Sequence, residues 1–213
     1  MQLVVSQLLP AYFDKSVTQV SEIWGKEWSV GKDEFIKIVA PSGSGKSSLI
    51  NFLYGLRTDY TGTIDYSGKD LSHFSPEQLA GYRKDHISIV FQDMRLFADE
   101  TAALNLEIKR QLNPYHPPEK IKEMAERLGI GSRLSFKCST CSYGEQQRIA
   151  IIRSLLQPFD ILLLDEPFSH LDNNNSEKAM QLILEETRAR NASISYADLE
   201  RSEIFPYTRI YHL

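Results

Sequence analysis

The stretch "APSGSGKSS", residues 40–48, decides the fold of this 213-residue chain. It departs from the phosphate-binding pattern G-x-x-x-x-G-K-[ST] at one position, because Ala40 stands where the pattern has its first glycine. The β-rich apolar run "FIKIV" (35–39) precedes it, and "SSLINFLYGL" (47–56) follows with helical spacing. Since a phosphate-binding loop needs a strand before it and a helix after it, the sequence favours this interpretation over a flexible Gly/Ser loop.

Each residue type in the loop has a physical role in holding phosphate. Gly43 and Gly45 let the backbone curl so that successive N–H groups converge on phosphate oxygens. Lys46 supplies charge for the outer phosphates, Ser47 offers a hydroxyl to Mg²⁺, and the following helix adds its positive N-terminal end. Ala40 is tolerable if its φ is negative. The residues expected to bind ATP here are Ser42, Gly43, Ser44, Gly45, Lys46, Ser47 and Ser48.

The second informative stretch is "ILLLDEP", residues 161–167, an apolar run that ends in two adjacent carboxylates. Asp165 at the strand tip is a candidate Mg²⁺ ligand, and Glu166 is a candidate to orient or deprotonate the attacking water. Alone, the pattern fits an ordinary acidic loop after a core strand equally well. Together with the loop at 40–48, it favours a magnesium–nucleotide site.

Continuously apolar runs at 35–39, 87–91, 161–164 and 193–196, with a last strand at 209–213, alternate with segments of helical character. Strands of this kind predict a parallel sheet covered on both faces. "GTIDYSGKDL" (62–71) predicts a hairpin with a Ser-Gly turn.

The helices are predicted from spacing and from their start signals. A helix begins after Ser75, with Pro76 at its first position and Gln78 completing a capping box. Further helices are expected within 101–134, broken by "NPYHPPEK", and at 145–156, 174–190 and 199–205.

Composition sets limits on the function. The chain is 42% hydrophobic and 24% charged, as in ordinary globular proteins, and its net charge of −4 gives no electrostatic case for a nucleic-acid partner. Two cysteines make no disulfide framework, and no run approaches the roughly 20 apolar residues of a membrane span. The N-terminus lacks a basic region typical of signal peptides. We expect a soluble, cytoplasmic protein.

The stretch "CSYGEQQR", residues 141–148, makes a family resemblance specific. Around it stand "IVFQDMRLF" with Gln92, "ILLLDEP", and "SHLD" (169–172), in the order found in ABC transporters. Over essentially its whole length the chain resembles the ATP-binding subunit of an ABC transporter, and the region after Gln92 resembles the short cassettes of lipoprotein-release and macrolide-export systems.

The resemblance implies an α/β fold of the P-loop NTPase class, with a RecA-like mixed or parallel sheet. It also implies an antiparallel β-subdomain near the N-terminus and an inserted helical subdomain. We therefore expect one ABC ATPase domain over 1–213, in which 1–92 and 145–213 form the core with the β-subdomain and 93–144 form the insertion.

The resemblance also implies a mechanism in which two cassettes close head to tail around two ATP molecules. Ser142 and the N–H groups near Gly144 would then reach the γ-phosphate held by the partner cassette. Gln92 would contact Mg²⁺ and the attacking water, and Glu166 would activate that water. The Mg²⁺ ligands implied are Ser47, Gln92 and Asp165.

An aromatic residue near the N-terminus of the family usually stacks on adenine. Tyr12 or Phe13 is suitably placed for this, with plain core packing as the alternative. Trp24 and Trp28 are expected in the core of the β-subdomain instead.

Besides Ala40, three positions depart from the family pattern. Residues 141–148 correspond to the signature sequence of the family. In it, Tyr143 replaces the first glycine and Cys141 replaces the leucine. Ala197 stands where the family has a histidine that contacts the γ-phosphate. Losing one such preorganised contact typically costs about 10²–10³ in rate, so we expect slow hydrolysis. His170 is close to the site in sequence, but a variable loop position is its simplest interpretation.

Two functions of different classes follow. The first is an ATPase that powers a separately encoded membrane permease, homodimeric with ATP and peripheral at the inner face of the membrane. The second is an ATP-gated dimerisation or regulatory module with little or no hydrolysis. The groove near Gln92, Met94, Leu96 and Phe97 is the expected docking surface for the permease.

The stretch "CSTC" (138–141) has two interpretations. It could be a redox or zinc-binding motif, or the two cysteines could stand there by chance.

Overall fold

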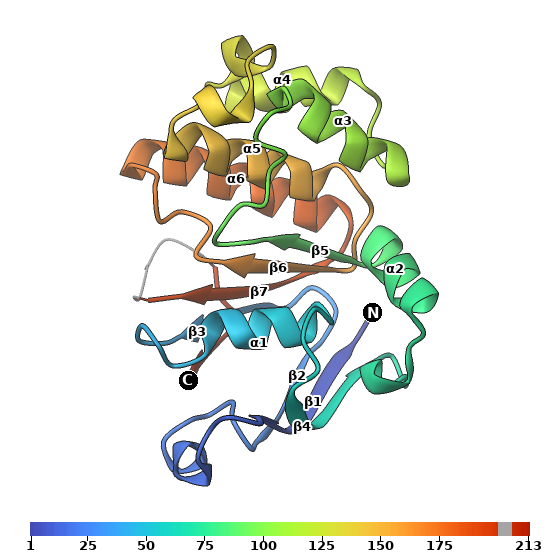
Figure 1. Ribbon diagram of the computed structural model, residues 1–213, viewed down its shortest axis with the longest axis vertical. Coiled ribbons are helices and arrows are strands. Elements are labelled where there is room, and N and C mark those ends of the chain that lie inside the picture. The colour runs from blue at the N-terminus through green and yellow to red at the C-terminus, as the bar shows by residue number, and fades with distance from the viewer. Residues whose placement is uncertain (200–205) are drawn as a thin grey trace.

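The computed structural model describes residues 1–199 and 206–213, and its centre is a five-stranded parallel sheet (Figure 1). The strand order is β5-β6-β7-β3-β8, and all four neighbouring pairs are parallel, as the apolar runs predict. Their bounds are Phe35–Val39 (β3), Ile87–Val90 (β5), Ile161–Asp165 (β6), Ser193–Asp198 (β7) and Arg209–His212 (β8). The predicted helix at 199–205 lies largely outside the described residues.

A second, antiparallel sheet forms the predicted β-subdomain, with the order β2-β1-β4. Its strands are Leu3–Pro10 (β1), Glu27–Val30 (β2) and Tyr60–Tyr66 (β4). Trp24 and Trp28 are buried in one hydrophobic cluster with these strands, which confirms their assignment to this core. The predicted hairpin turn forms at Ser67 and Gly68, both with positive φ, but its second arm is reduced to a single bridge between Asp65 and Asp70.

The helices cover both faces of the parallel sheet (Figure 1), α1 on one and α5 with α6 on the other. They are Lys46–Leu53 (α1), Pro76–Asp85 (α2), Ala102–Leu112 (α3), Glu119–Arg127 (α4), Tyr143–Leu155 (α5) and Asn173–Ala189 (α6). The described residues also form short 3₁₀ turns at Lys15–Gln19, Leu71–His73, Gly131–Arg133 and Cys138–Thr140. No helix of the described residues combines the length and apolar character needed to span a membrane.

The N-cap residues of α2, α5 and α6 determine where these helices begin. α2 begins as predicted, with Ser75, Pro76 and Gln78 forming the capping box. The predicted start of α5 at Glu145 is wrong by two residues, because Ser142 caps this helix and Glu145 completes a second capping box as its third residue. α6 starts at Asn173, one residue early, since Asp172 is its cap.

Helices α3 and α4 lie between β5 and α5 in the chain and form the outer layer of the molecule (Figure 1). They share one hydrophobic core with α5 and α6, through residues such as Leu106, Met124 and Ile152. The segment that follows Gln92 therefore packs directly on the helix that follows the signature. The boundaries at 92 and 144 remain a prediction.

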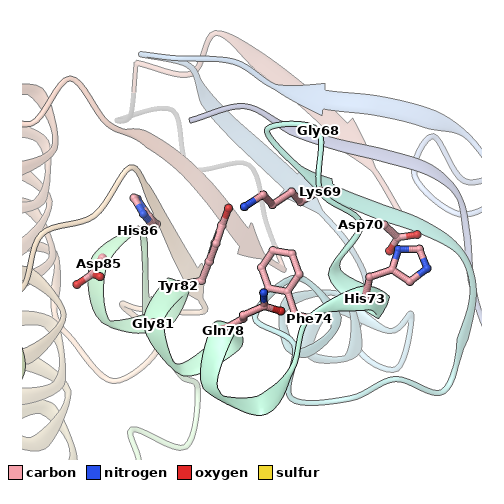
Figure 2. A pocket seen from close by; sticks show the side chains of 10 residues that line it. All are labelled: Gly68, Lys69, Asp70, His73, Phe74, Gln78, Gly81, Tyr82, Asp85 and His86. Carbon is pink, nitrogen blue, oxygen red and sulfur yellow. The ribbon is translucent and has the colours of Figure 1, made fainter.

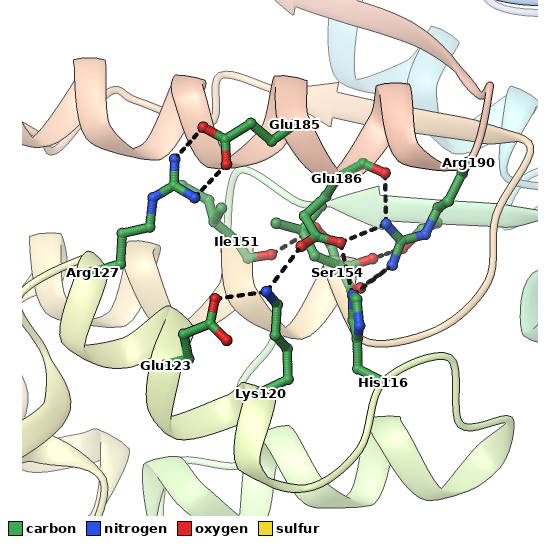
Figure 3. Close-up of polar contacts among 11 residues, drawn as sticks. His116, Lys120, Glu123, Arg127, Ile151, Ser154, Glu185, Glu186 and Arg190 are labelled. Atoms are coloured by element: carbon green, nitrogen blue, oxygen red, sulfur yellow. Dashed lines mark hydrogen bonds and ion pairs between the residues drawn. The ribbon is translucent and has the colours of Figure 1, made fainter.

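A buried ionic network ties α6 to α4 and to the segment before α4 (Figure 3). Glu186 accepts hydrogen bonds from Arg190 at 2.6 Å, lies 2.7 Å from His116 Nε2 and is 3.8 Å from Lys120 Nζ. Burial alone would raise the pKa of Glu186, but the hydrogen bonds with His116 and Arg190 outweigh it and hold the pKa at about 2. Outside this network, Glu185 of the same helix makes a solvent-exposed pair with Arg127.

We expect Glu186→Gln to lower the free energy of unfolding by about 3 kcal/mol at neutral pH, since the carboxylate is ~2.5 pKa units more acidic in the folded chain. This contribution is present above the unfolded pKa of 4.5 and is lost as the pH falls towards 2. Urea unfolding at several pH values measures it. Glu185→Gln is the matched control and should change stability by less than about 1 kcal/mol. Equal effects of the two variants would contradict the argument.

Candidate functional site

The loop between β3 and α1 takes its shape from two glycines. Gly43 and Gly45 have φ of 81° and 98°, a conformation that other residues rarely adopt. A Cβ atom at Gly45 would also approach Phe13 and Trp24 to 3.0 Å. Gly45 caps α1 without any side-chain hydrogen bond, so the first N–H groups of this helix face the loop.

Aromatic side chains support the loop from behind. The Trp24 indole N–H donates to the Ser44 carbonyl at 3.2 Å, and Phe13 packs edge-on against Trp24. Ala40 is fully buried, and it is not among the described residues with positive φ. An alanine therefore fits the first position of the pattern without strain.

Lys46 and Glu166 form a direct ion pair. The Lys46 ammonium lies 3.1 Å from Glu166 Oε1, and both side chains are buried. Glu166 has a φ of 47°, a strained value that its surroundings maintain. Its N–H donates to the Ala197 carbonyl at 3.0 Å, and its own carbonyl accepts from Gln147 at 3.1 Å.

Ser47, Gln92 and Asp165 converge beside this pair. The Ser47 hydroxyl donates to Gln92 Oε1 at 3.3 Å, and the Gln92 amide donates to Glu166 Oε2 at 3.3 Å. Burial raises the pKa of Asp165 to about 6, and a hydrogen bond with Ser47 partly offsets this rise. Asp165 Oδ1 is buried with no hydrogen-bond partner among the described residues. A hydroxyl, an amide oxygen and an orphaned carboxylate oxygen fit a Mg²⁺ ion.

A cavity of about 330 Å³ unites most of the residues predicted to bind ATP. It is lined by Tyr12, Phe13, Ser42, Gly43, Gly45, Lys46, Ser47, Ser48, Gln92 and Glu166. Ser44 is directed elsewhere, since its hydroxyl donates to the Pro41 carbonyl at 2.7 Å. Ser142 and Gly144 lie outside this cavity, at the start of α5.

The two aromatic candidates for adenine stacking have different surroundings. Phe13 packs under Gly45 and against Trp24, which matches core packing. Tyr12 is 52% exposed, its hydroxyl lies 2.6 Å from Ser48 Oγ, and the Arg57 guanidinium is 5.2 Å from its ring centre. Of the two, Tyr12 has the more accessible ring.

At the start of α5 the signature residues are engaged within the chain. The Ser142 hydroxyl accepts from the Glu145 N–H as the helix cap. Tyr143 is 67% exposed and stacks on His170, with ring centres 5.4 Å apart. A Cβ atom at Gly144 would lie 2.9 Å from the His170 carbonyl oxygen, so this position requires glycine. Tyr143 and His170 line a neighbouring cavity of about 530 Å³ that also reaches Ser47, Gln92 and Asp165.

Gln147 and Arg153 also position the site, although the sequence analysis did not identify them. Gln147 is buried, and its amide contacts the Glu166 carbonyl, Ser169 Oγ and the His170 N–H. Arg153 donates to the carbonyls of Met94 and Arg95, whose φ values of 58° and 47° are both left-handed. The sequence did contain a signal for Gln147. It is a polar residue on the same helical face as the buried apolar residues of α5, and a polar side chain at such a position needs hydrogen-bond partners.

Ala197 is fully buried and pairs in register with Asp165 across β7 and β6. Its methyl group belongs to the apolar cluster on the α1 side of the sheet.

The two cysteines, Cys138 and Cys141, are free. Burial raises the pKa of both thiols, that of Cys138 to about 11. Both thiols are therefore protonated at neutral pH, which disfavours thiolate chemistry.

A separate hollow of about 480 Å³ lies between the turn after β4 and α2 (Figure 2). It contains the packed rings of Phe74 and Tyr82, 4.6 Å apart, and none of the residues predicted to bind nucleotide. The lining residues are Gly68, Lys69, Asp70, His73, Phe74, Gln78, Gly81, Tyr82, Asp85 and His86.

The family model described as "ABC transporter" matches residues 25–169. Similar curated proteins include the macrolide export ATP-binding/permease protein MacB of Shewanella sp. (strain ANA-3), 34% identical over 74% of this chain and 24% of that protein. The MacB protein of Marinobacter nauticus is 33% identical over 87% of this chain and 29% of its own length. The chain thus spans about a quarter of the length of these relatives.

Solved structures that share the fold include two ATP-binding cassettes. One is a dimeric ATP-binding cassette in a post-hydrolysis state bound to ADP and phosphate, with a TM-score of 0.79, 24% identity, and coverage of 93% of this chain and 88% of that one. The other is a putative ABC transporter ATP-binding protein from Pyrococcus furiosus, with a TM-score of 0.79, 18% identity, and coverage of 100% and 98%.

Proposed function

The chain belongs to the ABC transporter family, whose ATP-binding cassettes are ATPases, and from this premise we propose that it drives transport through a separately encoded membrane permease. The observation that carries the proposal is the convergence at the carboxyl edge of the parallel sheet of Lys46, Ser47, Gln92 and Glu166 around one cavity, with Asp165 in the adjoining cavity and in contact with Ser47. The named relatives combine an ATP-binding part with a permease part in one protein, which supports pairing with a permease here.

Binding of ATP would use the charge now held by the Lys46–Glu166 pair. The Lys46 ammonium, 3.1 Å from Glu166, would turn to the outer phosphates, and the N–H groups at the start of α1 would add hydrogen bonds. Bound Mg²⁺ would neutralise phosphate charge, held by Ser47 and Asp165 with Gln92 beside them. Glu166, released from Lys46, would orient or deprotonate the attacking water.

We also propose that two copies close head to tail around ATP. In that arrangement Ser142 and the N–H groups near Gly144, at the start of α5, would face the phosphate held by the other copy. The solved cassette with a similar fold is dimeric, which supports this homodimer. Tyr143 projects from the same surface and would lie in the dimer contact.

A slow rate of hydrolysis is part of the proposal, and Ala197 is its main support. A methyl group offers no hydrogen bond to the γ-phosphate, whereas the histidine of the family does. We expect Ala197→His to raise steady-state phosphate release by about 10²-fold, the usual effect of one preorganised contact. Because Ala197 is fully buried, the imidazole also costs roughly 1–3 kcal/mol of stability, so thermal unfolding is measured alongside.

Tyr143→Gly is measured beside Ala197→His. This variant removes the ring that stacks on His170 and adds no polar group to the site. If a stably folded Ala197→His protein hydrolyses ATP no faster than the wild type, another residue does the work of the missing histidine. His170 would then be the first residue to replace.

The second candidate function is an ATP-gated regulatory module. Ala197 and the exposed Tyr143 favour it, while the intact Glu166 favours the ATPase. The two differ in turnover: a regulatory module binds ATP with normal affinity and dimerises, but its phosphate release does not exceed that of the Glu166→Gln variant.

The permease would dock near the segment that follows Gln92, and this contact would bring the chain to the membrane. One predicted docking residue is misplaced, since Met94 is buried, whereas Phe97 is 58% exposed and Leu96 is half-buried. We expect cysteine at Leu96 or Phe97 to crosslink to a cytoplasmic helix of a co-expressed permease encoded beside this chain. Cysteine at the exposed Val20, in the β-subdomain, is the control and should give no crosslink.

A further inference from the structure

The nucleotide cavity has a tyrosine at its edge that stands on a tight turn. Tyr12 comes just after β1, where the Phe13 N–H donates to the Pro10 carbonyl at 3.0 Å. The Tyr12 side chain lines the cavity and is largely exposed. An exposed side chain on a turn has several rotamers open to it, and ordering it when a ligand binds costs free energy. Contacts that order Tyr12 before binding therefore strengthen the binding of any base that stacks on it.

Arg57 lies over the Tyr12 ring. The central carbon of its guanidinium is 5.2 Å from the centre of the Tyr12 ring and 5.4 Å from that of Phe52. Tyr12 lines the cavity and Arg57 does not, so the tyrosine ring separates the guanidinium from the cavity. A base in the cavity would then meet the face of the ring that Arg57 leaves open. A cation over an aromatic ring is attracted to its π-electrons, and this attraction favours the ring orientation that the structure shows.

Further contacts fix the guanidinium and the ring relative to each other. Arg57 donates to Asp59 through two nitrogens, from Nε to Oδ1 at 2.9 Å and from Nη2 to Oδ2. Arg57 Nη1 donates to Ser48 Oγ at 3.2 Å, and the Tyr12 hydroxyl lies 2.6 Å from the same Oγ. The Asp59 carbonyl also accepts from the Ala11 N–H at 2.9 Å, next to Tyr12 in the chain. Lysine has one point charge and cannot make these contacts together, so the arrangement depends on the planar guanidinium.

We propose that Arg57 is a positioning residue for the base of ATP, which holds the Tyr12 ring, through the cation above it and the shared contact with Ser48, in the orientation on which adenine stacks. The inference rests on the proposed function, because it concerns the nucleotide that the cassette would hydrolyse. Arg57 acts through Tyr12 in this role and does not itself touch the nucleotide.

The test compares equilibrium binding of Mg-ATP with that of magnesium tripolyphosphate, which has the phosphates without a base. The variant combines Arg57→Ala with Asp59→Asn, so one charge of each sign is removed and the net charge is unchanged. Its Kd for Mg-ATP should rise about 10-fold, within the range that stacking of one base contributes, and its Kd for tripolyphosphate should stay within about 2-fold. A purely structural role for Arg57 predicts that both ligands weaken alike.

Two single substitutions serve as comparisons. Arg57→Lys keeps the charge and loses the planar fork, so its Kd for Mg-ATP should rise by about 5-fold. Lys69→Ala removes an exposed positive charge from the turn after β4 and should change the Kd of neither ligand. If Arg57→Lys binds Mg-ATP as tightly as the wild type, the positive charge alone suffices and the inference is wrong.

A double-mutant cycle with Tyr12→Ala asks whether Arg57 acts through the ring. Tyr12→Ala should raise the Kd for Mg-ATP at least as much as the paired change at Arg57 and Asp59. Added to Tyr12→Ala, the paired change should have an effect below about 2-fold, because no ring is left to hold. Additive effects would show that Arg57 acts on ATP independently of Tyr12, which overturns the inference.

The failure of this inference differs from the failure of the proposed function. If the paired change weakens Mg-ATP and tripolyphosphate equally, or if Tyr12→Ala binds Mg-ATP as tightly as the wild type, the role of Arg57 is wrong while the proposed function stands. If the wild-type chain binds neither ligand, the proposed function fails and this inference fails with it.

Discussion

Replacing Lys46 by alanine is expected to lower the affinity of the chain for Mg-ATP by at least about 30-fold, because a buried cation that faces phosphate contributes roughly 2–5 kcal/mol. The structure adds a second consequence. Glu166, now 3.1 Å from the Lys46 ammonium, would be left buried without a cation. Equilibrium binding of a fluorescent ATP analogue measures the first effect, and thermal unfolding the second.

Ala40→Gly is the control in the same loop. Because Ala40 does not occupy the left-handed region and its N–H already donates to the Asp198 carbonyl, we expect ATP affinity to change by less than about threefold. If Ala40→Gly instead converts a weak binder into a strong one, the loop itself is the damaged element and the argument for Lys46 loses its basis.

Glu166→Gln should reduce steady-state ATP turnover by about 10²–10⁴-fold, the range that a positioned general base contributes. Its affinity for ATP should equal or exceed that of the wild type. The Glu166 carboxylate pairs with the Lys46 ammonium, and an amide at this position would leave the ammonium available to the phosphates. The variant therefore separates binding from hydrolysis, in contrast to Lys46→Ala.

Glu177→Gln, which makes the same chemical change at an exposed position of α6, should leave both turnover and affinity unaltered. Phosphate release and equilibrium binding are measured on one preparation of each variant. Unchanged turnover in Glu166→Gln would show that the base is a different residue, or that the measured activity comes from a contaminating ATPase.

Much of the parallel sheet could be predicted because its signals are local. Buried parallel strands are continuous apolar runs, so 35–39 and 161–164 could be recognised without knowledge of their neighbours. The start of α2 was also predictable, since Ser75, Pro76 and Gln78 form a complete capping signal within four residues. The convergence of Lys46 with Glu166 follows from a general rule, because the carboxyl ends of parallel strands meet at one edge.

The contacts that were missed join segments far apart in the chain. Arg153 lies 58 and 59 residues from the carbonyls that it holds, so nothing near it in sequence indicates its role. The stacking of Tyr143 on His170 depends on how α5 meets the loop before α6. The burial of Met94 depends on its left-handed backbone, which no local residue preference predicts, because methionine rarely adopts it.

A Cβ atom at Gly144 would lie 2.9 Å from the His170 carbonyl oxygen. Positions 143 and 144 of the signature are therefore under different constraints. Position 144 is restricted by folding of the single chain, before any ATP or second copy is present. The side chain at position 143 is 67% exposed and its ring stacks on His170, so folding of the single chain restricts this position much less. Folding alone therefore requires the glycine at 144 and tolerates other residues at 143, and the sequence "SYGE" meets this requirement. Deep mutational scanning for solubility alone should tolerate many residues at Tyr143 and almost none at Gly144.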